Sequence, residues 1–229
     1  MSFFPMMASG LVLLNDEATG ETWIGGTCAA YVTRRTVLTA GHCVPDGRIP
    51  YVHLPGLKEP QRALRVSRHE ASDVALLHLP ASGEELSTQV YRPLSPDFTL
   101  IDGGDFLGHG YPVEGSANAL PVGRLFKGHF QRYFGYEPPS GGSGYFAAEM
   151  STPAPAGLSG GVLAYANEPD VAVAVVTTNV DSWVTIDRFE SVEREGQVYR
   201  EEIRRVVSYG IAAMLTGLGP WLEAELSGT

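Results

Sequence analysis

The chain has 229 residues, of which 44% are hydrophobic, so it can form a full apolar core without a metal or a disulfide framework. Its formal net charge of −10 argues against nucleic acid as a partner, because binding to phosphates requires a clustered basic surface. Its two cysteines are too few, and wrongly spaced, for a zinc ribbon or a redox C-x-x-C motif.

The N-terminal sequence, MSFFPMMASGLVLLNDE, is unlike a signal peptide. No basic residue precedes its apolar run, which Pro5, Ser9 and Gly10 interrupt. No stretch of the chain approaches the roughly 18 consecutive apolar residues of a transmembrane helix. We therefore expect a cytoplasmic protein that has no membrane partner.

Short segments rich in Val, Leu, Tyr and Thr follow one another along the chain. They include GLVLL at 10–14, TVLTA at 36–40, DVALLHL at 73–79, LPVGRLFKGHF at 120–130 and VAVAVVTT at 171–178. Turn residues separate them about every 8–12 positions, and the chain has 27 glycines and 16 prolines. This pattern predicts an all-β barrel or sandwich rather than alternating βαβ units.

Three regions depart from this pattern. EPPSGGSGY, residues 137–145, predicts a flexible loop and lacks the Gly-Lys-Ser/Thr ending of a phosphate loop. The charged segment 187–205 predicts a solvated hairpin or helix on the surface. GPWLEAEL, residues 219–226, predicts a short helix, because Pro220 lies at its start and good helix formers follow.

Three reactive residues stand in distinctive surroundings. His42 follows the β-rich run TVLTA, and Asp73 leads directly into the apolar segment VALLHL. Burying the Asp73 carboxylate would be costly without a hydrogen-bond donor, and an imidazolium can be that donor. Taken alone, Asp73 could simply cap a turn. Ser159 lies in PAGLSGGV, whose glycines can turn several backbone amides into one pocket, although alone it could be a Gly-Ser loop. The other histidines have no metal-ligand spacing, so we expect no metal.

Together these motifs resemble those of the chymotrypsin-like serine proteases. TAGHC is similar to the family's histidine motif, DVALLHL to its aspartate motif and GLSGG to its nucleophile motif, in the family's chain order. GHGYP is similar to the region that opens the second barrel, and SYGIAAML with PWL to the last strand and helix. The resemblance implies one peptidase domain, 1–229, with two six-stranded antiparallel β-barrels at about 8–100 and 101–215 and a helix at about 219–227.

The resemblance also implies a serine endopeptidase that needs no cofactor and acts on a protein or peptide. His42 would take the hydroxyl proton of Ser159, and Asp73 would orient the imidazole. The backbone N–H groups of Gly157 and Ser159 would form the oxyanion hole. We expect a dedicated intracellular target as the substrate.

The same resemblance places the S1 pocket, which receives the substrate side chain preceding the scissile bond. Its base would be Pro153, and its walls Thr177, Thr178, Asn179 and Gly210. Such a pocket would not attract Arg or Lys strongly, unless the charged insertion supplied Asp181, Asp187 or Glu190. Cys28 and Cys43 match the family's disulfide beside the histidine loop, although a reducing cytoplasm would keep them as thiols.

Leu158 stands where zymogen-type members carry an aspartate that pairs with a newly released N-terminus. A leucine cannot form that ion pair, and the N-terminal region lacks an Arg-Ile-Val-Gly-Gly activation sequence. We therefore expect activity without N-terminal cleavage. Packing, substrate or an activating partner protein would then order an oxyanion loop that shifts between competent and incompetent forms.

Two other functions use the same residues. The chain could be a catalytically idle member that binds peptides, but an idle site would be free to lose members of the triad. It could also be an esterase with the same triad. The chain order argues against the α/β-hydrolase version, which runs Ser…Asp…His.

Overall fold

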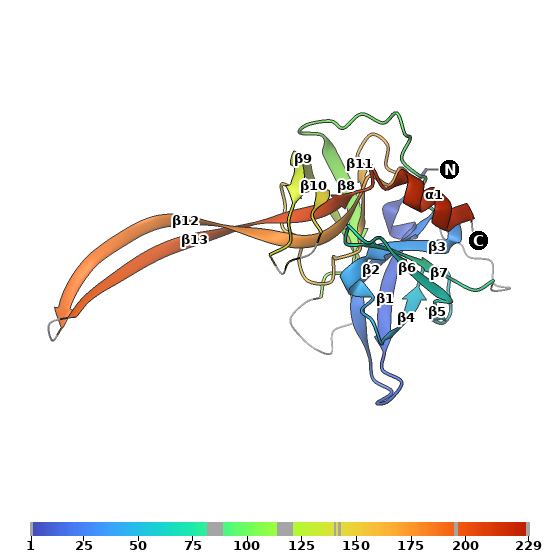
Figure 1. Ribbon diagram of the computed structural model, residues 1–229, viewed down its shortest axis with the longest axis horizontal. Helices are drawn as coiled ribbons and strands as arrows, with labels where there is room; N and C mark the ends of the chain where they lie inside the picture. The colour runs from blue at the N-terminus through green and yellow to red at the C-terminus, as the bar shows by residue number, and fades with distance from the viewer. Residues whose placement is uncertain are drawn as a thin grey trace.

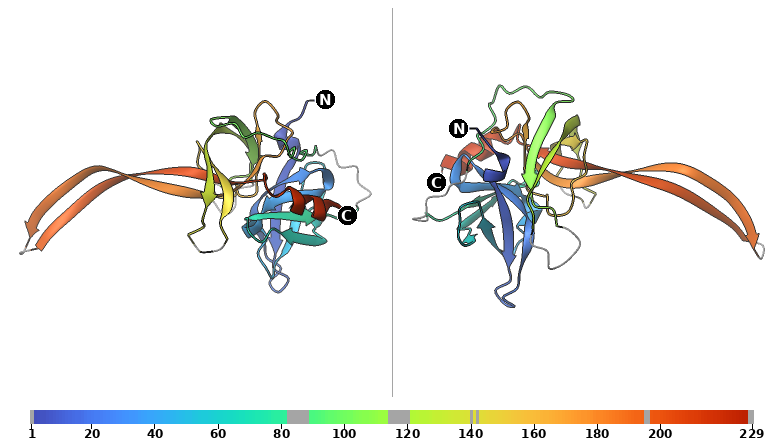
Figure 2. Two further views of the ribbon diagram at one scale, coloured as in Figure 1. Left: turned by 45° about the horizontal axis from the view of Figure 1, so that its top comes forward. Right: turned by 180° about the vertical axis from the view of Figure 1, so that it is seen from behind.

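The computed structural model describes residues 2–81, 89–113, 121–139, 141, 143–194 and 197–227. The protein is all-β, as predicted: two strand assemblies lie side by side, and a long hairpin projects from the second (Figures 1 and 2). No helix within these residues is long and apolar enough to cross a membrane.

The first half begins with a 3-10 turn, Pro5–Met7. Its strands are β1 (Ser9–Asn15), β2 (Thr22–Tyr31), β3 (Thr33–Ala40), β4 (Ile49–His53), β5 (Gln61–Arg62), β6 (Arg65–Arg68) and β7 (Val74–His78), and a second 3-10 turn, Gly41–Cys43, follows β3. They form one antiparallel sheet in the order β5-β4-β1-β2-β3-β7-β6. All five residues of β7 are buried, which explains its uninterrupted apolar sequence.

This half therefore has seven strands and not the six that we predicted. The two edge strands, β5 and β6, are separated in the chain by Ala63 and Leu64 alone. Ala63 N–H donates to Pro50 O (2.9 Å) and Leu64 N–H to His78 O (2.8 Å), so both edges of the sheet meet at this bend. The count differs because one barrel strand is bent and divided in two.

The second half is a closed barrel of six strands, as predicted. These are β8 (Asp105–Gly110), β9 (Arg124–Tyr136), β10 (Tyr145–Met150), β11 (Val162–Tyr165), β12 (Ala174–Arg194) and β13 (Gln197–Met214). Their order around the barrel is β10-β13-β12-β11-β8-β9. Helix α1 (Gly219–Ser227) then returns to the first half, where Glu225 accepts hydrogen bonds from Arg65 (2.5 Å) and Ser67 (2.7 Å).

Beyond the barrel, β12 and β13 continue as a two-stranded arm, Asp181–Ser208, which stands clear of the body (Figure 1). The charged segment 187–205 is thus a hairpin, the first of the two forms predicted. The two halves share one buried apolar cluster, to which Leu38 and Leu76 contribute from the first and Val175 and Ile211 from the second. The candidate site lies where the halves meet.

Candidate active site

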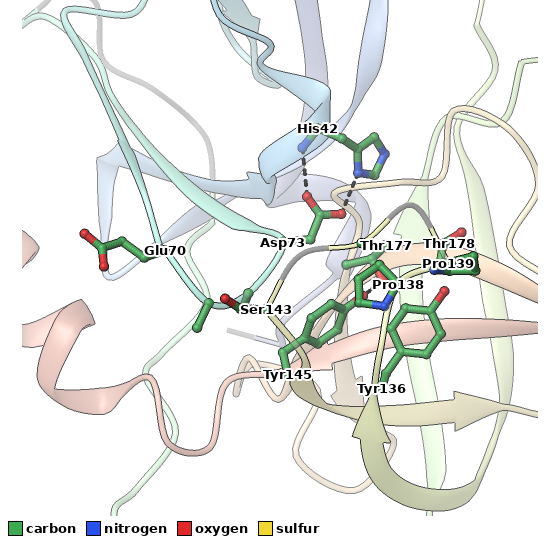
Figure 3. Close-up of a pocket in the computed structure, with 13 residues that line it drawn as sticks. His42, Glu70, Asp73, Tyr136, Pro138, Pro139, Ser143, Tyr145, Thr177 and Thr178 are labelled. Atoms are coloured by element: carbon green, nitrogen blue, oxygen red, sulfur yellow. Dashed lines mark hydrogen bonds and ion pairs between the residues drawn. The ribbon is translucent and has the colours of Figure 1, made fainter.

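Strand pairing brings His42 and Asp73 together although they are 31 residues apart. β3 and β7 are antiparallel neighbours with Ala40 opposite Val74, so the turn after β3 lies beside the residue that precedes β7. His42 N–H donates to Asp73 Oδ1 (2.8 Å), and His42 Nδ1 lies 2.6 Å from Asp73 Oδ2 (Figure 3). A Cβ atom at Gly41 would lie 2.9 Å from Asp73 Oδ1, so the preceding glycine leaves room for this contact.

This contact controls the charge of the imidazole. Burial alone would lower the pKa of His42, but the hydrogen bond to Asp73 and the negative charge of that carboxylate raise it above its usual value. The His42 side chain remains 48% exposed and that of Asp73 28% exposed. The imidazole is therefore held at Nδ1 by Asp73, while the rest of the ring is partly exposed to solvent.

Ser159 lies in the turn before β11, and its carbonyl oxygen lies 3.5 Å from the thiol of Cys43, the residue after His42. The Ser159 hydroxyl donates to Thr177 O at 3.2 Å, and within the described ranges no hydrogen bond joins it to His42. Thr177 lines a pocket of about 460 Å³ together with His42, Asp73 and Thr178 (Figure 3). His42 and Asp73 thus line one pocket, and the Ser159 hydroxyl is turned towards β12, where it contacts Thr177 of the same pocket.

The two amides predicted to form an oxyanion hole have fixed directions. In a trans peptide the N–H points opposite to the C=O. Ala156 O accepts from Val113 N–H (2.7 Å), which turns the Gly157 N–H the other way, and Leu158 O accepts from Gly161 N–H (2.9 Å), which does the same for Ser159.

Neither the Gly157 nor the Ser159 N–H donates a hydrogen bond within the described part of the chain, whereas their neighbours Leu158, Gly160 and Gly161 all do. Gly157 has φ +86°, and a Cβ there would lie 2.5 Å from Tyr111 O, so glycine is required. Two free donors beside a serine hydroxyl can stabilise a developing oxyanion.

Thr27, which belongs to none of the sequence motifs, holds this loop. Its side chain is fully buried, and its hydroxyl donates to Gly157 O (2.7 Å) and accepts from Tyr111 N–H (3.0 Å). Its own backbone N–H donates to Ser159 O (2.8 Å). Thr27 therefore fastens both ends of the Gly157–Ser159 segment to the first half of the molecule, a role that only the tertiary structure reveals.

Leu158 is buried, with 1% of its surface exposed, in an apolar cluster with Phe106, Met150 and Ala154. The packing is close, since a Cβ at Gly110 would lie 2.5 Å from Leu158 Cδ1. An aspartate at this position would be buried among apolar side chains. The leucine fits its environment without an N-terminal amine.

Asn179 occupies the region predicted as the S1 pocket. Asn179 lies opposite Gly210 in the β12–β13 register. Because Gly210 has no Cβ, the Asn179 side chain can reach across to the segment after β10. Asn179 Oδ1 accepts from Ala154 N–H (2.7 Å), and Asn179 Nδ2 donates to Ala154 O (2.6 Å). A carboxamide therefore crosses the space between these two walls.

Other predicted pocket residues lie elsewhere. Pro153 is exposed, next to the buried Ala154 that Asn179 holds. Asp181 Oδ1 accepts from Ser208 Oγ (2.6 Å) on the arm. Asp187 lies on the arm about 26 Å of strand beyond Asn179, so it cannot supply a carboxylate to the pocket base. The side chain of Glu190 lies outside the described residues.

Two further expectations concern segments beside the cleft. Five residues of the 137–145 segment line the pocket that contains His42: Pro138, Pro139, Gly141, Ser143 and Tyr145. Cys28 and Cys43 are both buried thiols, so the disulfide implied by the family resemblance is not formed. The Cys43 thiol instead lies 3.5 Å from Ser159 O, where it can donate to that carbonyl. No group of three or more His, Cys, Asp or Glu side chains within the described ranges could hold a metal ion.

The fold is that of the chymotrypsin-like serine proteases, as the motifs predicted. Among solved structures, the Rv3671c protease of M. tuberculosis in its active form is similar, with a TM-score of 0.65 and 15% identity over 96% of this chain and 81% of that one. A serine-to-alanine mutant of that protein in an inactive form gives a TM-score of 0.60 and 16% identity over 98% and 89%.

A thermostable serine protease from an extremophilic microorganism gives a TM-score of 0.53 and 16% identity over 75% of this chain and 85% of that one. No protein-family model matches the chain, and no curated protein matches it in sequence. At these identities the similarity establishes the fold and not the activity.

Proposed function

We propose that the protein is a serine endopeptidase that acts through His42, Asp73 and Ser159. The observation that carries this proposal is the pair of free, oriented amides at Gly157 and Ser159, in a turn whose serine hydroxyl donates to Thr177 O beside the His42–Asp73 pair. A loop that only connected strands would have no need to keep two amides unpaired beside a serine.

The reaction would begin when Ser159 Oγ leaves Thr177 O and donates its proton to Nε2 of His42. The deprotonated oxygen attacks the scissile carbonyl carbon, and the carbonyl oxygen becomes an oxyanion between the Gly157 and Ser159 amides. Asp73 stabilises the imidazolium, which then gives its proton to the leaving amine. Water, activated by the same histidine, hydrolyses the acyl-enzyme and restores the serine.

We further propose that the residue before the scissile bond is small. The Asn179 carboxamide, held by two hydrogen bonds to Ala154, occupies the volume that a large side chain would need. Neither of the two described arm carboxylates expected to attract Arg or Lys serves the pocket, because Asp181 binds Ser208 and Asp187 lies far along the arm.

The tight packing of Leu158 supports activity without N-terminal cleavage. The thiol state of Cys28 and Cys43 supports a reducing compartment such as the cytoplasm. We also propose that the substrate is a protein or peptide and that a partner protein orders the cleft.

A fluorophosphonate probe tests the nucleophile directly. Labelling of the full chain that is lost in Ser159→Ala supports the triad, and no labelling of the folded chain indicates an idle peptide-binding protein. A peptide library compared with simple esters then separates a peptidase from an esterase. We expect Ser159→Ala, His42→Ala and Asp73→Asn each to lower peptide cleavage by about 10⁴-fold, with unchanged circular dichroism.

A further inference from the structure

Within the part of the chain that the structure describes, the outer edge of β12 pairs with another strand only near its start. β12 pairs with β13 from Ala174 to Arg194, but with β11 only at Ala174 and Val175. Val176 still bonds to the turn at Gly160 and Gly161, and beyond it the edge opposite β13 has no strand partner among the described residues. Residues 178–186 thus present an open strand edge about 30 Å long.

This edge begins inside the proposed active site. Thr177 O accepts the Ser159 hydroxyl at 3.2 Å, and Thr177 and Thr178 line the pocket beside the His42–Asp73 pair. A polypeptide whose carbonyl reaches Ser159 therefore meets β12 at the start of the open edge. The same strand then leaves the body as the arm (Figures 1 and 2).

The arm also exposes apolar side chains. Trp183, Val184 and Ile186 on β12 are 61%, 51% and 62% exposed, and Ile203 and Val206 on β13 are 50% and 44% exposed. An open strand edge with apolar side chains is a template for pairing with another chain. A two-stranded ribbon alone is also marginally stable in water. The arm is therefore suited to being covered along its edge.

We propose that the substrate covers the arm: residues about six to eight positions before the scissile bond pair with β12 beyond the cleft, as an antiparallel strand that runs from the arm towards Ser159. This inference rests on the proposed peptidase function. Every ladder between named strands in the molecule is antiparallel. Because β12 leaves the cleft outwards, a strand antiparallel to it reaches Ser159 with its C-terminal end.

The register defines the class of substrate. Both strands advance equally per residue, so the substrate residue opposite Trp183 lies about six positions before the one opposite Thr177. Backbone pairing supplies affinity, and apolar residues about six to eight positions before the scissile bond would pack on Trp183 and Val184. The substrate is thus an extended polypeptide segment with at least about ten residues before the cleaved bond.

Peptides that share one cleavage sequence test this inference. We compare three peptides: one with three residues before the scissile bond, one with ten residues before it that include alternating valines, and one that carries the same extension after the bond. We expect the N-terminal extension to raise kcat/KM by about tenfold or more and the C-terminal extension to leave it unchanged. N-methylation of one alternating set of amides should abolish the gain and that of the other set should not, because alternate amides of a strand face its partner.

Variants of the chain locate the effect. In the first, an Asn-Gly turn replaces residues 183–206 and joins Ser182 to Val207, which are partners in the hairpin register. It should cleave the three-residue peptide normally and lose the gain from extension. Trp183→Lys should reduce the gain, whereas Leu125→Lys, at a 60% exposed leucine on β9, should not.

Three results would overturn the inference: equal kcat/KM for long and short peptides, insensitivity of the gain to shortening the arm, or a dimer that the shortened arm abolishes without any change in cleavage. The last would assign the edge to a second copy of the chain. Binding of the long peptide to Ser159→Ala, measured by fluorescence anisotropy, separates this inference from the peptidase proposal. Arm-dependent binding without cleavage by the unaltered chain would refute the peptidase and leave the strand pairing in place.

Discussion

Replacing Thr27 by valine tests whether the nucleophile loop is held from the first half of the molecule. The substitution keeps the shape of the buried side chain but removes the hydroxyl that donates to Gly157 O (2.7 Å) and accepts from Tyr111 N–H (3.0 Å). Each buried polar group left without a partner costs about 1–3 kcal/mol. Both contacts are only partly buried, so we expect the free energy of unfolding to fall by about 2–4 kcal/mol.

The effect on catalysis should exceed what this loss of stability implies. Gly157 O belongs to the peptide that follows the first oxyanion amide, so the loop loses one of its anchors. Loss of a whole oxyanion donor lowers kcat by about 10²–10³-fold, and a loosened donor should cost about 10–100-fold. Urea unfolding and kcat for a good peptide, both measured well below the unfolding midpoint, separate the two effects.

Thr27→Ser is the matched control, since it keeps the hydroxyl and removes one methyl group, worth about 0.8 kcal/mol. It should retain most of the activity. If Thr27→Val unfolds more easily yet keeps its kcat, the hydroxyl stabilises the fold without positioning the loop. If serine and valine lower kcat equally, packing of the methyl group is the cause, and the reasoning from the hydroxyl is refuted.

Three other outcomes are expected. Because the pKa of His42 is raised, the neutral imidazole that acts as the base becomes more abundant as pH rises, so kcat/KM should increase from neutral to alkaline pH. In Asp73→Asn the pH profile of any residual activity should have its midpoint at a lower pH, and an unshifted midpoint would contradict this. Asn179→Gly should admit larger side chains before the scissile bond, measured as the ratio of kcat/KM for Phe and Ala peptides, and an unchanged ratio would show that the carboxamide does not limit the pocket. Reductant should leave activity and thermal unfolding unchanged, because Cys28 and Cys43 are thiols; loss of folding in mild reductant would show that a disulfide forms.

The sequence predicts the parts of this protein that local patterns encode. Alternating apolar segments and turn residues indicate an all-β chain. The surroundings of His42, Asp73 and Ser159 single out three residues, of which the fold joins the first two and sets the serine hydroxyl against Thr177 of the same pocket. Each of these motifs sits at the end of a strand, where a short sequence determines both the turn and the chemistry.

Contacts between distant segments were not predictable in this way. The hydroxyl of Thr27 is 130 residues from Gly157, and nothing in its own neighbourhood marks it. Asn179 reaches Ala154 only because the hairpin register sets it opposite Gly210. The projecting arm is hidden for another reason: its charged sequence is typical of any solvated surface element, and only the pairing of β12 with β13 shows how far it extends.

The position of β13 between β12 and β10 has a consequence for synthesis of the protein. The loop that contains Ser159 rests on β12 through Gly160 N–H and Val176 O (2.8 Å), and β12 in turn rests on β13, which ends at Met214. A ribosome that has just added the serine must therefore complete 55 more residues, from 159 to 214, before the second barrel can close around it. A partly made chain carries all three triad residues without the framework that aligns them, so the protein should become able to cut other polypeptides only late in its own translation.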